Sequence, residues 1–133
     1  MKVALELIDL GLTPGGGGYR FVVAEGAPAG QESAVLGYAC FGATPLTDGV
    51  WDLYWIAVHP AHQGSGVAAE LLREVERLVV LERARMLLIE TASKASYARQ
   101  RTFYLKSGYR EVARVPDFYA VGDDRVIYAR SFR

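Results

Sequence analysis

The segment from residue 51 to residue 90 constrains the fold more than any other part of the chain. It begins with WDLYWIAV (51–58), whose aromatic and β-branched residues predict a strand. From Val67 to about Arg83 the apolar residues recur with the period of an amphipathic helix. MLLIE (86–90) then predicts a strand buried on both faces. Because strand, helix and strand form a βαβ unit, we expect the two strands to be parallel.

The chain before this unit predicts an antiparallel meander. Residues 19–25 and 33–43 have the composition of strands, and the GAPAGQ sequence between them is typical of a hairpin turn. With the strand over 51–58 they form three consecutive strands joined by short connections. Ahead of them, the apolar spacing over residues 3–10 favours a short helix, and the four glycines 15–18 predict a flexible loop.

A second helix and two more strands complete the predicted fold. The helix spans about Tyr97 to Ser107 and ends at Gly108. The strands span about 109–115 and 125–130, and the aspartates between them (117, 123 and 124) fit turn chemistry better than substrate binding. We therefore expect residues 1–133 to form a single α/β domain with a mixed sheet, in which the antiparallel meander is followed by the βαβ crossover.

The composition argues against several classes of function. The chain has 15 Lys and Arg against 15 Asp and Glu, and this neutral balance argues against nucleic acid as a partner. Its apolar runs are far shorter than the ~20 residues of a membrane span. Cys40 is the only cysteine, which excludes an internal disulfide and, without a signal peptide, indicates a cytoplasmic location. His59 and His62 have no evident third ligand, so we expect no metal.

The turn between strand and helix has the features of an anion site. Gly64, Ser65 and Gly66 allow a ligand to approach the backbone closely, and the first turn of a helix has free N–H groups and a partial positive charge. These features predict a phosphate or pyrophosphate site, with a purely structural tight turn as the alternative. A Walker A loop is excluded, because Val67 and Ala68 follow the last glycine in place of Lys and Ser or Thr.

Two more specific interpretations of this turn remain. The GxGxxG/A pattern is formally matched by Gly64, Gly66 and Ala69, which keeps an NAD(P)-binding Rossmann-type enzyme as an alternative. The other interpretation is that QGSGVA (63–68) matches the acetyl-CoA pyrophosphate motif Q/R-x-x-G-x-G/A. On this motif, and on the later segments FYLKSGYREV and DFYAVGDDRVIYARSF, the chain resembles small bacterial members of the GNAT superfamily of N-acetyltransferases from about residue 19 to its end.

The resemblance implies a fold, an activity and a cofactor site. In this family two central parallel strands splay apart, and the pantetheine arm of coenzyme A pairs with the first of them. The implied activity is transfer of an acetyl group from acetyl-CoA to a primary amine of a small molecule or peptide, by direct attack in a ternary complex without a metal. A non-catalytic acyl-CoA-binding module is a further alternative. The residues implied in cofactor binding are Ile56, Ala57, Val58, Gln63, Gly64, Ser65, Gly66, Val67 and Ala68.

Two catalytic residues are also implied. A primary alkylamine has a pKa of ~10 and must lose a proton to attack, so a general base is needed. Asp52 stands where some family members carry a Glu base, and strand alternation would place it on one face with Tyr54, Ile56 and Val58. A structural hydrogen bond at the strand edge is the alternative role for Asp52. Tyr104 matches the family tyrosine that protonates the leaving thiolate and contacts the cofactor.

The chain departs from the family pattern at two places. Many relatives have an Asn seven residues before the tyrosine, whereas this chain has Tyr97, which shares a helical face with Tyr104 and is expected to line the cofactor cleft. Many relatives also have another strand and one or two helices before the strand at residue 19, where they form one wall of the acceptor site. The shorter segment here predicts an open acceptor site, an acceptor site completed by a second subunit, or a chain from which these elements have been trimmed. The second of these makes a homodimer a candidate assembly.

Overall fold

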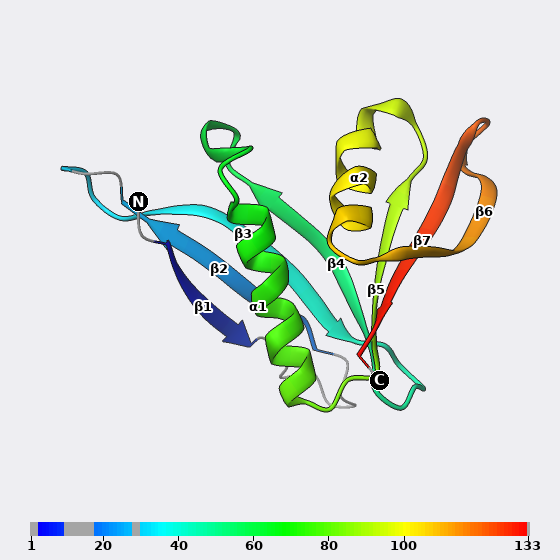
Figure 1. The fold of residues 1–133 in the computed structure, drawn as a ribbon, viewed down its shortest axis with the longest axis horizontal. Coiled ribbons are helices and arrows are strands. Elements are labelled where there is room, and N and C mark those ends of the chain that lie inside the picture. The colour runs from blue at the N-terminus through cyan, green and yellow to red at the C-terminus, as the bar shows by residue number, and fades with distance from the viewer. Residues whose placement is uncertain (1–2, 10–17, 28–29, 133) are drawn as a thin grey trace.

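The computed structural model describes residues 3–9, 18–27 and 30–132, which form one seven-stranded sheet and two α-helices (Figure 1). The spatial order of the strands is β1-β2-β3-β4-β5-β7-β6. A short 3-10 turn precedes each helix, Pro60–His62 before α1 and Ala95–Tyr97 before α2. The elements are β1 (Val3–Asp9), β2 (Arg20–Gly26), β3 (Ala34–Ala43), β4 (Val50–Val58), α1 (Val67–Leu81), β5 (Met86–Ala92), α2 (Ala98–Lys106), β6 (Arg110–Ala120) and β7 (Asp123–Ser131).

The pairing of the strands confirms the predicted mixed sheet. Strands β1 to β4 form an antiparallel meander, and β4 and β5, joined through α1, are the one parallel pair in the described sheet. A doubly wound Rossmann sheet is built mainly from parallel strands with its glycine motif after the first of them. The glycine turn here follows the fourth strand, so this topology does not fit the NAD(P)-binding alternative.

The two parallel strands diverge halfway along their length. β4 and β5 pair only from Val50 with Met86 to Leu53 with Ile89. Beyond this point β4 continues to Val58 and β5 to Ala92, and Figure 1 shows the two strands opening like a V beside α2. Each strand keeps its outer partner, β3 or β7, so the facing edges carry backbone N–H and C=O groups that the sheet leaves unpaired. The predicted splay of the central strands is confirmed.

Helix α1 covers one face of the first half of the sheet. Its buried residues recur every three or four positions and join the residues of β2, β3 and β4 in one core cluster. Gly37 of β3 is required under this helix, because an added Cβ would lie 2.6 Å from the Ala57 carbonyl oxygen. Tyr104 of α2 joins the same cluster and packs against Tyr109 and Tyr128.

The prediction of a helix over residues 3–10 is wrong. Residues 3–9 form β1 and pair with β2 from Val3 with Gly26 to Asp9 with Arg20. A helix this short is marginal in water, whereas the free edge of β2 offers hydrogen-bond partners along its whole length. Residues 15–17 of the predicted glycine loop lie outside the described residues.

Two strands also differ in detail from the prediction. β6 continues beyond the predicted end at residue 115, since Pro116 is tolerated on an outermost strand and a register shift between Val115 and Ala120 absorbs the irregularity. In β4, Tyr54 is an extra residue in the register with β3. Such a β-bulge resets the alternation of side chains, so Asp52 faces the opposite side of the sheet from Ile56 and Val58. The prediction that these residues share one face is wrong.

Candidate active site

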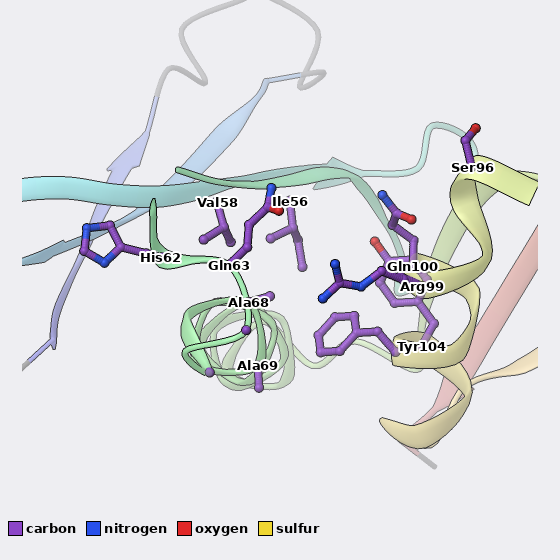
Figure 2. A pocket seen from close by; sticks show the side chains of 13 residues that line it. Ile56, Val58, His62, Gln63, Ala68, Ala69, Ser96, Arg99, Gln100 and Tyr104 are labelled. Carbon is purple, nitrogen blue, oxygen red and sulfur yellow. The ribbon is translucent and has the colours of Figure 1, made fainter. Parts of the chain in front are cut away.

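A pocket of about 570 Å³ opens at the amino-terminal end of α1, between β4 and α2. Figure 2 shows the side chains of Ile56 and Val58 from β4 and of Arg99, Gln100 and Tyr104 from α2 converging on it, opposite the first turn of α1. We call it the glycine-loop pocket. Its lining residues are Ile56, Val58, His62, Gln63, Gly64, Gly66, Ala68, Ala69, Ser96, Arg99, Gln100, Phe103 and Tyr104.

Two glycines give this pocket a bare backbone wall. Gly64 has φ +80° and Gly66 has φ +88°, values that glycine adopts without strain, and a Cβ at either position would meet no atom within 4 Å. Gly66 is the N-cap of α1 and provides no side-chain cap. The first N–H bonded within the helix is that of Glu70, which donates to the Gly66 carbonyl oxygen at 3.1 Å. The preceding amides of the first turn therefore have no helical acceptor and suit an anion.

Local hydrogen bonds fix the turn that presents these amides. His59 Nδ1 accepts from the Ala61 N–H at 3.1 Å, and the Ser65 hydroxyl donates to the His62 carbonyl oxygen. The Ser65 side chain thus holds the loop together and does not line the pocket, whereas Gln63 does. Among the described residues, no group of three His, Cys, Asp or Glu side chains could hold a metal ion.

The structure brings most of the predicted cofactor residues together. Those that line the glycine-loop pocket are Ile56, Val58, Gln63, Gly64, Gly66, Ala68 and Tyr104. Val67 is buried in the core under α1, and Ala57, adjacent to Ile56 on the strand, faces the opposite side of the sheet. These two residues and Ser65 do not line the pocket and would contribute only backbone groups to it.

Several lining residues were missed by the sequence analysis. Ser96, Gln100 and Phe103 recur every three or four residues, the spacing of one helical face, and Tyr104 continues it. This helical spacing relative to Tyr104 could have identified these residues as pocket-lining from the sequence. Arg99, whose role as a phosphate contact or as part of a solvated helix face the sequence left open, lines the pocket and adds a positive charge to it.

A second pocket of about 360 Å³ lies between the diverging ends of β4 and β5, and we call it the splay pocket. Ile56, Gln100 and Tyr104 line both this pocket and the glycine-loop pocket, so the two cavities meet at these three side chains. Tyr97, predicted to line the cofactor cleft, lines the splay pocket instead. Its other lining residues are Tyr54, Trp55, Glu90, Thr91, Ala92, Lys94, Tyr119 and Asp123.

Tyr104 is the most buried polar group at this junction. Its side chain is 7% exposed, and burial raises its pKa to about 12. The hydroxyl is therefore protonated at any physiological pH and can donate a hydrogen bond to an atom placed between the two pockets.

Asp52 lies further from this junction than the sequence predicted. Its carboxylate accepts a hydrogen bond from the Thr44 hydroxyl at 2.7 Å and lines a third pocket of about 400 Å³. That pocket adjoins the splay pocket through Tyr54, Glu90 and Tyr119, which line both. Burial and the nearby charge of Asp52 raise the pKa of Tyr54.

Glu90 is a carboxylate at the splay to which the sequence analysis gave no role in acyl transfer. It is the first residue of β5 after the last pair with β4, and it faces both the splay pocket and the third pocket. Glu90 Oε1 accepts a hydrogen bond from the Tyr119 hydroxyl at 3.3 Å and lies 2.7 Å from Arg125 Nε in an ion pair. Arg125 Nε is buried and makes no directed hydrogen bond, and the guanidinium lies over the ring of Phe118. In the sequence, the available indication of Glu90 was a single acidic residue at the end of an apolar strand.

The aspartates of the β6–β7 hairpin make structural contacts, as turn chemistry predicts. Asp123 Oδ1 accepts from the Lys94 N–H at 3.1 Å, and the Asp124 N–H donates to the Ser93 hydroxyl at 2.7 Å. Within the hairpin, Asp117 Oδ1 accepts from the Gly122 N–H at 2.7 Å. These bonds fasten the hairpin to the loop between β5 and α2, next to the splay pocket.

Comparison with known proteins agrees with this geometry. Residues 17–111 match the family model of the acetyltransferase (GNAT) domain. A protein from Desulfovibrio desulfuricans assigned to the GNAT acetyltransferases is 42% identical, with a TM-score of 0.77 over 85% of this chain and 69% of that chain. No curated protein sequence matches this chain. Within the part of the chain that the structure describes, no helix is long and apolar enough to cross a membrane.

More distant structures share the fold. IAA acetyltransferase from Bacillus cereus is 19% identical, with a TM-score of 0.77 over 98% of this chain and 100% of that chain. A Salmonella typhimurium protein assigned as an acetyltransferase, solved with its cofactor acetyl-CoA, is 21% identical, with a TM-score of 0.71 over 86% of this chain and 65% of that chain. At these identities the similarity establishes the fold alone.

Proposed function

The chain belongs to the GNAT acetyltransferase family, and we propose from this premise that it transfers an acetyl group from acetyl-CoA to a primary amine of a small molecule or peptide. One observation carries the proposal: the glycine-loop pocket and the splay pocket meet at Ile56, Gln100 and Tyr104. A donor held in the first cavity and an amine held in the second would react where they meet. Transfer in such a ternary complex needs no covalent acyl-enzyme intermediate.

The residues of the glycine-loop pocket fit coenzyme A. The free amides at the start of α1 and the open space over Gly64 and Gly66 suit its pyrophosphate, with Gln63 and Arg99 beside them. The edge of β4 from Tyr54 to Val58 has no partner in β5, so its N–H and C=O groups suit the amide groups of the pantetheine arm. When bound, acetyl-CoA supplies the activated acyl group.

The proposed reaction is a direct acyl transfer. The amine nitrogen attacks the thioester carbon, so that the N–C bond forms as the C–S bond breaks and the sulfur leaves as a thiolate. A backbone N–H of the splayed part of β4 would stabilise the charge that develops on the carbonyl oxygen. Tyr104 would donate to the leaving sulfur, and the amine proton passes to a base. Cys40 is fully buried and burial raises the pKa of its thiol, which supports a reaction without a protein thioester.

Two carboxylates are candidates for the base. Asp52, the position implied by the family, does not line the splay pocket and would act through intervening water. Glu90 lines that pocket together with Tyr104. The variants Asp52→Asn and Glu90→Gln separate the two in a pH profile of kcat/KM. Loss of the base shifts the profile to higher pH, where more of the amine is already neutral, and a profile that stays in place excludes that carboxylate.

The proposed function is tested by thiol release from acetyl-CoA against a panel of primary amines. The expected result is amine-dependent release of coenzyme A with formation of the acetylated amine by mass spectrometry. Calorimetric binding of coenzyme A without turnover of any amine would instead support the non-catalytic acyl-CoA-binding module.

We also propose a cytoplasmic homodimer. One of the two outermost strands, β6, is exposed at every residue, including the apolar Val112 and Val115, and an open edge of this kind can pair with another chain. The buried free thiol of Cys40 suits a reducing compartment. Light scattering on a size-exclusion column tests the assembly, and the mass of a single chain would overturn it.

A further inference from the structure

Five aromatic side chains form a continuous patch on the sheet face opposite α1. Ring centroids lie 5.3 Å apart for Tyr19 and Tyr54, and 6.3 to 6.5 Å apart for the other neighbouring pairs among Phe21, Tyr38, Tyr54 and Trp55. These residues come from β2, β3 and β4 and from the residue that precedes β2. We call them the aromatic patch.

The aromatic patch is exposed to solvent, whereas the opposite face of the same strands is buried under α1. Tyr19 is 54% exposed, Trp55 44%, Tyr54 39% and Tyr38 37%. On the α1 face, by contrast, Phe41 and Trp51 are buried in the core. Contiguous aromatic surface left open to water is typical of a binding site, because its exposure costs free energy that a ligand recovers.

The patch is continuous with the reaction site. Tyr54 and Trp55 belong both to the patch and to the lining of the splay pocket, and that pocket reaches Tyr104. A molecule that rests on the patch can therefore extend a short arm into the splay pocket. This continuity ties the patch to the acceptor and not to the donor, which enters from the α1 face.

The end of this path offers an ammonium group one free carboxylate oxygen. Both contacts that Glu90 makes with described residues use Oε1, which leaves Oε2 to accept from an incoming amine. The hydroxyl of Tyr119 lies beside it. The ammonium of Lys94, another lining residue, lies over the ring of Tyr97, with Nζ 5.3 Å from the ring centroid. The backbone N–H of Lys94 donates to Asp123. A cation that enters would meet aromatic faces and the Oε2 of Glu90, whose Oε1 is paired with Arg125.

Resting on the acetyltransferase function, we propose that the acceptor is an arylalkylamine, a primary amine joined by a short chain to an aromatic ring. The ring lies against Trp55 and Tyr38 of the aromatic patch, and the amine enters the splay pocket toward Glu90. There it loses its proton and takes the acetyl group from sulfur, as in the direct transfer described above.

The test compares phenylethylamine with cyclohexylethylamine, which has the same chain and ring size but no aromatic face. Thiol release with saturating acetyl-CoA should give a kcat/KM about tenfold higher for phenylethylamine, since ring stacking adds to simple burial. Trp55→Leu and Tyr38→Leu should remove this preference. Leu81→Ser, which changes an exposed apolar residue at the end of α1, should keep it.

Calorimetric binding of the two amines to the protein with coenzyme A separates the possible failures. Equal kcat/KM values for both amines would leave the transferase function standing and overturn the arylalkylamine proposal. Tighter binding of phenylethylamine that depends on Trp55, without its turnover, would support the binding site and overturn its role as the acceptor site. Failure of phenylethylamine to bind more tightly than cyclohexylethylamine would overturn the site itself. Thermal unfolding of each variant checks that it is folded.

Discussion

The positive φ of Gly66 shapes the turn that is proposed to bind the cofactor. This φ of +88° is open to glycine and costs other residues about 1–2 kcal/mol. Gly30 offers a matched control, because it has φ +80° and its added Cβ would also meet no atom within 4 Å, but it lies in the turn between β2 and β3. Alanine at either position therefore carries the same strain, and only at Gly66 does the new methyl group enter the glycine-loop pocket.

We expect Gly66→Ala to weaken acetyl-CoA binding by tenfold or more, about 1.4 kcal/mol, and Gly66→Leu to abolish it. Gly30→Ala should lose a similar amount of stability and bind normally. Isothermal titration calorimetry with acetyl-CoA measures both affinities, and urea unfolding measures both stabilities. Equal affinities in the two alanine variants would show that the bare amides of the turn do not hold the cofactor.

We predict that the Tyr104 hydroxyl contributes to turnover and not to the binding of acetyl-CoA. Tyr104→Phe keeps the ring that packs against Tyr109 and Tyr128 and removes only the hydroxyl between the two pockets. We expect kcat to fall roughly 10²-fold with the Kd of acetyl-CoA unchanged, the size of a lost proton donor. Tyr128→Phe is the control, since Tyr128 is equally buried and lines neither pocket. Unchanged turnover in Tyr104→Phe would remove its proposed role.

The sequence predicted backbone conformation at the site better than side-chain direction. The glycine motif fixes a strand, a turn with positive φ and a helix start, and the structure has all three. Whether Ser65 and Val67 point into the pocket depends on the hydrogen bond to the His62 carbonyl oxygen and on the core under α1. Those are tertiary contacts, so a local motif does not contain them.

At the scale of elements, the β-bulge at Tyr54 decides which side chains reach each pocket. A strand pattern predicts strict alternation, and one extra residue reverses it for the rest of β4. Nothing in the composition of WDLYWIAV marks the extra residue, because its position depends on the register with β3. The strand β1 was missed for a related reason: its conformation comes from pairing with β2 and not from its own apolar spacing.

The β6–β7 hairpin holds one wall of the splay pocket, and Asp124 fastens it. Its Oδ1 accepts from the Asp117 N–H at 2.9 Å and its Oδ2 lies 2.9 Å from Arg114. The Asp117 N–H, and then Arg114, lower the pKa of the Asp124 carboxyl. A carboxyl whose folded pKa is below its unfolded value of ~3.9 stabilises the fold above that value, and the contribution is lost as the pH falls through the folded pKa.

We expect Asp124→Asn to loosen the hairpin and to flatten the loss of stability below pH ~4. Because the hairpin positions Tyr119 at the splay pocket, the KM of the acceptor amine should rise roughly tenfold while that of acetyl-CoA stays unchanged. Arg77→Gln, which breaks an exposed ion pair with Glu74 on α1, should change neither KM. A parallel rise of both KM values in Asp124→Asn would indicate general unfolding and contradict this role.

On the scale of the whole molecule, two sheet halves meet along a short seam. Only the four pairs from Val50 with Met86 to Leu53 with Ile89 join β4 to β5, and both pockets open where the seam ends. The parallel seam followed from the βαβ pattern in the sequence. The insertion of β7 between β5 and β6 did not, since it is set by long-range pairing that no local pattern records.

The second half of the molecule buries three tyrosines side by side, and this predicts its behaviour in alkali. Burial raises the pKa of Tyr104 to about 12 and raises the pKa of Tyr128, and burial together with a hydrogen bond to Glu76 raises that of Tyr109. An unfolded tyrosine has a pKa of ~10. A folded pKa above the unfolded value means that stability is fully present below pH ~10 and is lost as the pH rises toward the folded pKa.

We therefore expect the free energy of unfolding to fall steeply above pH ~10, with Tyr104 alone contributing about 1.4 kcal/mol of the loss by pH ~11. Urea unfolding at intervals from pH ~8 to pH ~11 measures the curve for the wild type and for Tyr104→Phe. Other ionisable groups titrate alike in both proteins, so the difference between the curves isolates this phenol. The variant should lose less stability in alkali than the wild type, and curves that run parallel through the whole range would mean that Tyr104 ionises in the folded protein as easily as in water.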